Sequence, residues 1–87
     1  MEQEKLVKIF KALANERRFS ILKHLFSKRE LTVGQISELI ELSFKSVSKH
    51  LLILTNAGLV ESRQINLSKM YSINTKRPRE FIKFFHN

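Results

Sequence analysis

Residues 42–60 read LSFKSVSKHLLILTNAGLV, and this stretch decides the fold. Ser43 suits the start of a helix, because a serine side chain can accept a hydrogen bond from the first turn. Four apolar residues then recur at helical spacing: Phe44, Val47, Leu51 and Leu54. Such a stripe predicts one buried face along a helix over about residues 44–56. Gly58 supplies the left-handed residue that commonly ends a helix, and Leu59 can pack back on it.

The segment before this helix predicts a second, shorter helix. Thr32 followed by Gln35 is a capping-box pattern, and the apolar residues that follow it allow about eight helical residues. Glu41 and Leu42 then form a tight connection to Ser43. Two short helices joined by such a turn are the helix-turn-helix unit, here spanning residues 32–57.

The outward side of the second helix is polar and small. It carries Lys45, Ser46, Ser48, Lys49 and, in part, His50. A major groove about 12 Å wide accepts one α-helix, and side chains near its N-terminus reach base edges. These residues are therefore candidate DNA contacts, together with Phe44, which could either staple the helix start or touch a thymine methyl. Gln35, at the start of the preceding helix, is a further candidate contact.

After Gly58 the period changes from helical to strand-like. Residues 60–65 and 69–73 resemble two strands with a short hairpin connection, which predicts a wing over residues 60–73. Arg63, Asn66 and Lys69 lie on this wing. They are candidate contacts to an adjacent DNA backbone or minor groove.

The remaining segments predict helices at both ends of the chain. Residues 4–13 form an amphipathic helix, a second helix follows Asn15, and residues 30–32 allow a brief strand. Pro78 fits the first turn of a last helix over residues 78–86. Seven apolar residues of the terminal helices are assigned to a dimer interface: Leu6, Phe10, Leu13, Phe81, Ile82, Phe84 and Phe85. A chain end this apolar would favour aggregation if it were left in water, although packing within one chain is the alternative.

The predicted fold class is mainly α with a small β-hairpin (α+β), in the order α-α-(β)-α-α-β-β-α. The 87 residues are expected to form a single winged helix-turn-helix domain over residues 1–87. The net charge is +8, of which residues 43–79 carry +6. That excess favours a polyanionic partner, and a solvated surface that only aids solubility is the alternative.

Composition argues against several other classes of protein. No apolar run is long enough to span a membrane, so no membrane partner is expected. The acidic start lacks a hydrophobic signal segment, which favours a cytoplasmic protein. There is no cysteine, and His24, His50 and His86 lie on three separate elements, so no metal or other cofactor is expected. No catalytic constellation stands out, and the chain is not expected to be an enzyme.

Three stretches resemble one known family, the ArsR/SmtB-type (arsenic-responsive) repressors. Residues 12–22 are similar to that family's LADPTRLRIL opening, and residues 31–39 to its third helix. Residues 42–51, followed by Leu54 and residues 57–60, are similar to LSQSTVSRHLKVLREAGLV. The resemblance covers about residues 10–73 and implies a homodimeric DNA-binding repressor whose recognition helix begins at Ser43. It also implies that the first and last helices form the dimer interface.

The chain departs from the metal-sensing members of that family. Those members place cysteines where this chain has Thr32 and Gly34, and others place Asp/His pairs on a last helix where this chain has only His86. A member that does not sense metal is therefore expected, binding double-stranded DNA at a pseudo-palindromic operator. The alternatives are a winged helix used for protein–protein assembly and a non-specific nucleic-acid-binding protein.

Overall fold

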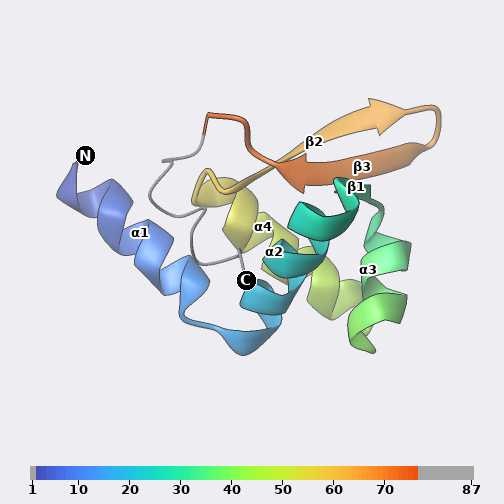
Figure 1. The fold of residues 1–87 in the computed structure, drawn as a ribbon, viewed down its shortest axis with the longest axis horizontal. Helices are drawn as coiled ribbons and strands as arrows, with labels where there is room; N and C mark the ends of the chain where they lie inside the picture. The colour runs from blue at the N-terminus through green and yellow to red at the C-terminus, as the bar shows by residue number, and fades with distance from the viewer. Residues whose placement is uncertain (1, 77–87) are drawn as a thin grey trace.

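The structure, a computed structural model, describes residues 2–76 (Figure 1). Its elements are α1 (Gln3–Leu13), α2 (Glu16–Lys28), β1 (Glu30–Leu31), α3 (Val33–Ile40), α4 (Phe44–Asn56), β2 (Val60–Ile65) and β3 (Ser68–Ile73). The predicted α+β class and the predicted order as far as the wing are confirmed. The predicted last helix over residues 78–86 lies outside the described residues.

The strands form one antiparallel sheet in the order β1-β3-β2. Val60 pairs with Ile73 at the base of the β2–β3 hairpin and Ile65 pairs with Ser68 at its tip, which leaves a two-residue loop. Asn66 in that loop has a φ of +55°, a conformation that asparagine tolerates. Figure 1 shows the hairpin projecting past α3, away from α1, as a wing.

One apolar core joins the helices to the base of the sheet. Its buried residues are Ile9, Ala12, Ile21, Leu22, Leu25, Leu31, Ile36, Val47, Leu51, Leu54, Leu59 and Val60. Every helix and two of the strands contribute to it, so α4 is held from behind by side chains distant in sequence. Burial of this apolar surface is the main force that fixes α4 in place.

Local signals in the sequence set the ends of the helices as predicted. The Thr32 hydroxyl accepts from the Gln35 N–H at 3.2 Å, and the Gln35 side chain accepts from the Thr32 N–H at 2.9 Å. At the end of α4, Gly58 has a φ of +76°. The Leu59 N–H donates to the carbonyl of Leu54 at 3.0 Å, which closes a Schellman motif.

The structure corrects the buried stripe predicted for α4. Val47, Leu51 and Leu54 are buried as expected, but Phe44 is 62% exposed. Phe44 is the first residue of α4, so no earlier helical turn lies beside it to shield the ring. Leu42, two residues earlier, packs against the core instead and takes the place from which a hydrophobic residue can staple the helix start.

Candidate DNA-binding surface

The turn between α3 and α4 fixes where the front of α4 points. The Ser37 hydroxyl donates to the Leu42 carbonyl, and the Leu42 N–H donates back to the Ser37 carbonyl at 3.2 Å. Glu41 adopts a left-handed conformation with a φ of +53°. Ser43 then caps α4 by accepting from the Ser46 N–H at 3.1 Å. Hydrogen bonds within the turn and at the cap therefore fix the direction of the first turn of α4.

The front of α4 is basic and exposed. Lys45 and Lys49 lie one helical turn apart and both are exposed, while the opposite side of α4 is sealed in the core. Ser48 lies half-buried beside them. This arrangement presents two ammonium groups on a rigid helix, which suits contact with phosphates or with guanine.

Leu52 belongs to the same exposed side and was not among the residues predicted there from the sequence. It is 60% exposed and follows Lys49 by three residues. The signal that could have found it is the spacing itself, since residues 45, 49 and 52 share one helical face.

Two residues expected at the front of α4, His50 and Ser46, are only partly exposed. Nδ1 of His50 is buried and has no hydrogen-bond partner among the described residues. Burial, followed by the charges of Arg18 and Arg17 on α2, lowers the pKa of His50 and favours the neutral ring. Ser46, one turn earlier on α4, is half-buried, and its hydroxyl accepts from the Ser43 hydroxyl at 3.0 Å. Both residues are therefore less accessible than Lys45 and Lys49, and their contact with bases stays a prediction.

The two cations predicted on the wing point to opposite faces of the sheet. Side chains alternate between faces along a strand, so Lys69 shares the face of Tyr71 and Ile73, which pack against the core. Arg63 lies on the outer face and donates two hydrogen bonds of 2.8 Å to the Glu30 carboxylate. That hydrogen bond lowers the pKa of Glu30. Lys69 is thus the wing cation on the side of the helices, whereas Arg63 is already paired within the chain.

Gln35 and Asn66, the other predicted contacts, are exposed, and each makes a hydrogen bond within the chain. The side-chain oxygen of Gln35 is used in the cap of α3, which leaves its amide N–H groups to face solvent. Asn66 is exposed at the tip of the wing, and its main-chain carbonyl accepts a hydrogen bond from the Gln64 side chain at 3.1 Å.

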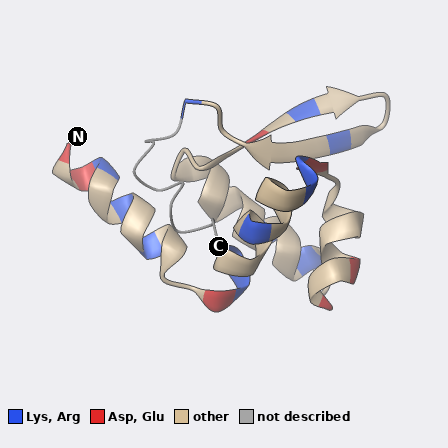
Figure 2. Cartoon of the chain, in the orientation of Figure 1, with Lys and Arg blue, Asp and Glu red and all other residues tan. Residues whose placement is uncertain are grey.

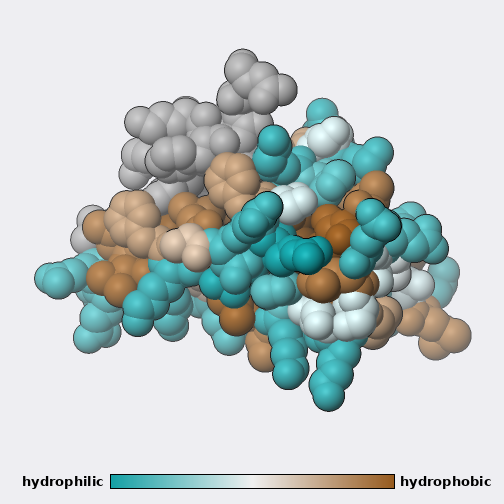
Figure 3. Space-filling model, turned by 90° about the horizontal axis from the view of Figure 1, so that it is seen from below, coloured by the Kyte–Doolittle hydropathy of each residue, from teal (hydrophilic) through white to brown (hydrophobic). Residues whose placement is uncertain are grey.

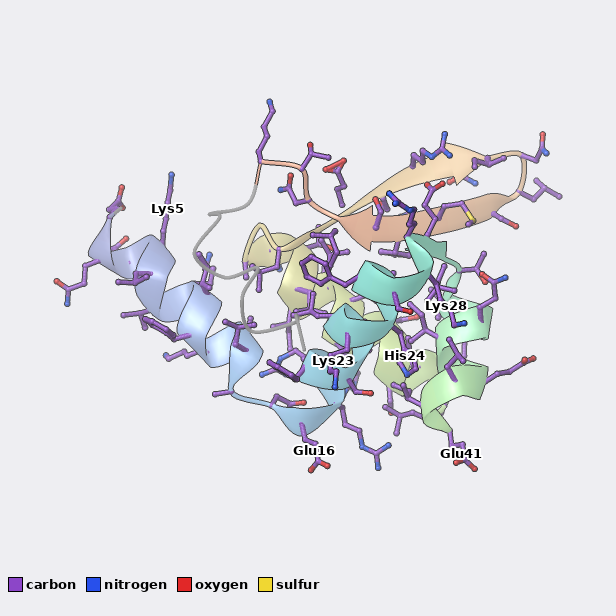
Figure 4. The ribbon with its side chains drawn as sticks, in the orientation of Figure 1. Lys5, Glu16, Lys23, His24, Lys28 and Glu41 are labelled. Carbon is purple, nitrogen blue, oxygen red and sulfur yellow. The ribbon has the colours of Figure 1, made fainter. Side chains whose placement is uncertain are left out.

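Basic residues dominate α4 and the wing. Over residues 43–76 the chain has five Lys and Arg residues and one acid, Glu61. Figure 2 shows the cations on the helices and on both strands of the wing. Figure 4 shows Glu16 and Glu41 at the edge of the molecule opposite the wing. Glu41 lies in the turn that leads into α4, so the charge that favours a polyanionic partner is the excess of Lys and Arg over acids on α4 and the wing themselves.

The face of α1 predicted for dimer contacts is divided between the core and solvent. Leu6 and Leu13 pack partly against the chain's own core, and Phe10 is 51% exposed with Val7 exposed beside it. In Figure 3, hydrophobic side chains gather on the α1 side of the molecule. Phe81, Ile82, Phe84 and Phe85 lie outside the described residues.

Two further observations concern cofactors and membranes. Among residues 2–76, no three side chains of His, Cys, Asp or Glu gather as metal ligands. Within the same part of the chain, no helix is both long enough and apolar enough to cross a bilayer.

Comparison with known families identifies this architecture. Residues 15–62, which contain α2, α3, α4 and the start of the wing, match the family described as "Bacterial regulatory protein, arsR family". The chain belongs to the arsR family. The resemblance seen in the sequence is confirmed.

Individual relatives agree with this assignment. The transcriptional activator HlyU of Vibrio cholerae is 38% identical over 82 residues, covering 94% of this chain and 75% of that protein. Its solved structure superposes with a TM-score of 0.83 over 99% of this chain and 95% of that chain. The transcriptional repressor PagR of Bacillus anthracis is 30% identical over 86 residues, covering 99% of this chain and 86% of that protein.

A third relative is described in its own right as a dimer. The homodimeric winged helix-turn-helix DNA-binding domain of Mb0332 from Mycobacterium bovis is 29% identical, with a TM-score of 0.81 over 94% of this chain and 72% of that chain. Together with the exposed basic front of α4, these findings make the arsR-family chain a DNA-binding transcription regulator. The family and these relatives are regulators of transcription, and the absence of catalytic activity stays a prediction.

Proposed function

We propose that the chain is a homodimeric, cytoplasmic regulator that inserts α4 into the major groove of a pseudo-palindromic operator and represses transcription by occupying a promoter. The observation that carries this proposal is the front of α4. Lys45 and Lys49 are exposed, and the rear of the same helix is locked in the core. In a dimer, two such helices read two half-sites about one helical turn apart.

Phosphate contacts from α4 and the wing supply most of the affinity in this proposal. Lys49 and Lys69 stand on the two elements that face the duplex, and each neutralised phosphate releases counterions. Binding therefore weakens steeply as salt is added. Ser48 and the base-facing part of Lys45 provide sequence information that phosphate contacts lack.

Selection of bound duplexes from a random pool, followed by footprinting, tests the proposal. Lys49→Ala should weaken binding to the selected site and reduce the salt slope by about one unit for each phosphate that is no longer neutralised, hence about two per dimer. Lys23→Ala is the matched control, because Lys23 is an exposed lysine on α2, outside α4 and the wing (Figure 4). A footprint and salt slope unchanged by Lys49→Ala would exclude this placement of the recognition helix.

The dimer is proposed from the exposed face of α1 and from the homodimeric relative. Phe10 and Val7 present apolar surface that a twofold interface would bury. Phe10→Ser should shift the measured mass in solution toward the monomer. Leu39→Ser, which changes a comparably exposed residue on α3, should leave the mass unchanged. A Phe10→Ser protein that stays dimeric would place the interface elsewhere.

The sign of regulation is tested separately, because relatives bear both names. HlyU is named an activator and PagR a repressor. In transcription with purified polymerase, a promoter that overlaps the selected site should give less transcript as the protein is added. More transcript from that promoter would make the chain an activator.

A further inference from the structure

The exposed side of α4 carries two rows of side chains with different chemistry. Lys45 and Lys49 form one row, and Phe44, Ser48 and Leu52 form a second row at intervals of four residues. Phe44 is 62% exposed and Leu52 is 60% exposed. We call the second row the apolar ridge of α4, because the residues at its two ends are large and apolar and only the small Ser48 lies between them.

The core does not account for the apolar ridge. Leu42 packs at the start of α4, so the Phe44 ring is not needed to anchor the helix. Because most of the Phe44 ring stays in water, the ring adds little stability to the fold through burial. The ring also stands at the first residue of α4, the end from which a recognition helix reaches base edges.

A phenyl ring cannot donate or accept the hydrogen bonds that most base edges offer. In the major groove, the apolar feature on a standard base pair is the C5-methyl group of thymine. We propose that Phe44 is a specificity-determining residue, which packs against a pyrimidine C5-methyl group in each half-site. This inference rests on the proposed function, because it requires α4 to enter the major groove.

The neighbouring residues support this occupant rather than a protein partner. Lys45 and Lys49 lie along one side of the ridge and would place a second protein's apolar surface beside two uncompensated charges. DNA phosphates compensate the same charges. Ser48, with its small side chain, leaves room beside the ring for a base edge to approach.

Single replacement of thymine by uracil tests the proposal, because the two bases pair alike and differ only by the methyl group. The full chain is bound to its selected duplex, with each thymine of the half-sites replaced in turn. At one position, uracil should weaken wild-type binding about fourfold per half-site, the factor expected when one methyl group is no longer buried. In the Phe44→Ala protein, the ratio of thymine to uracil affinities at that position should fall to about one.

Two further variants separate the methyl contact from a general loss of affinity. Phe44→Leu keeps an apolar side chain and should keep a ratio clearly above one. Ile65→Ala removes an exposed apolar side chain from the wing and should keep the wild-type ratio. Replacing the same base pair by C·G should weaken wild-type binding, and 5-methylcytosine at that position should restore part of the affinity, which would extend the preference from thymine to methylated cytosine.

The outcomes are distinct. A wild-type protein that binds its duplex but responds to uracil at no position would overturn the inference, as would an unchanged ratio in Phe44→Ala. Melting curves show whether the Phe44→Ala protein is folded. We expect that it is, because the Phe44 side chain is mostly exposed. If the wild-type chain bound no duplex at all, the proposed function itself would fail, and an exposed Phe44 would belong to a protein interface.

Discussion

Leu54→Ala tests whether the rear of α4 holds the recognition helix in place. Leu54 is 0% exposed and lies among the core residues that α4 shares with the other helices. The substitution removes three buried carbons, at about 0.8 kcal/mol each, and the unfilled space brings the cost to about 3 kcal/mol. For a domain of this size, the melting temperature should fall by roughly 12–24 °C at fixed protomer concentration.

Leu52→Ala is the matched control, since it makes the same change two residues away on the exposed side of α4. Leu52 is mostly exposed, so the free energy of unfolding should change by less than about 0.5 kcal/mol. Melting by circular dichroism measures both variants. If Leu52→Ala lost as much stability as Leu54→Ala, Leu52 would be packed against a neighbouring subunit, and the front of α4 would not be free for DNA.

Glu30→Gln removes the charged acceptor of the two Arg63 hydrogen bonds and should lower the melting temperature at pH 7. Because the hydrogen bond from Arg63 lowers the pKa of Glu30, this stabilisation is complete above the usual pKa of 4.5 and is lost as the pH falls through the lowered value; equal differences at pH 7 and pH 3 would contradict this. Burial lowers the pKa of His50, so protonation favours unfolding as the pH drops below 6.5. His50→Gln removes this protonation, so its stability should fall less than that of the wild type when the pH is lowered from about 7.5 to about 5.5, an interval that brackets the ordinary pKa of 6.5. His24→Gln serves as the control. Thr32→Ala should cost about 1 kcal/mol of stability because the cap is removed, with Thr32→Ser restoring it; a melting temperature unchanged by Thr32→Ala would mean that the cap is dispensable.

The parts of the fold that were predictable depend on residues close together in sequence. The caps at Thr32 and Ser43, and the left-handed Gly58, each act within about four residues. The apolar period of α4 likewise reports burial wherever a neighbour covers the helix. These local signals place the helix-turn-helix and the wing to within a residue or two.

The parts that could not be predicted depend on contacts between distant segments. Helical spacing placed Phe44 with the buried stripe, but spacing carries no information about where the covering element stops. The pairing of β1 with β3 brings Glu30 within reach of Arg63, 33 residues later. That pairing gives Arg63 a partner within the chain, which the strand pattern alone does not predict. The surroundings of His50 likewise depend on Arg17 and Arg18 of α2, which the spacing along α4 does not reveal.

The two rows on α4 make different contributions to binding: the lysine row supplies affinity, and the apolar ridge supplies specificity. The Lys45–Lys49 row acts through charge, so its contribution falls with added salt and changes little with base sequence. A contact between the Phe44 ring and a methyl group carries no charge, so the ratio of thymine to uracil affinities should stay constant as salt weakens overall binding. Because the two rows are offset by one residue on the same helix, substitutions can change one contribution while the other is kept.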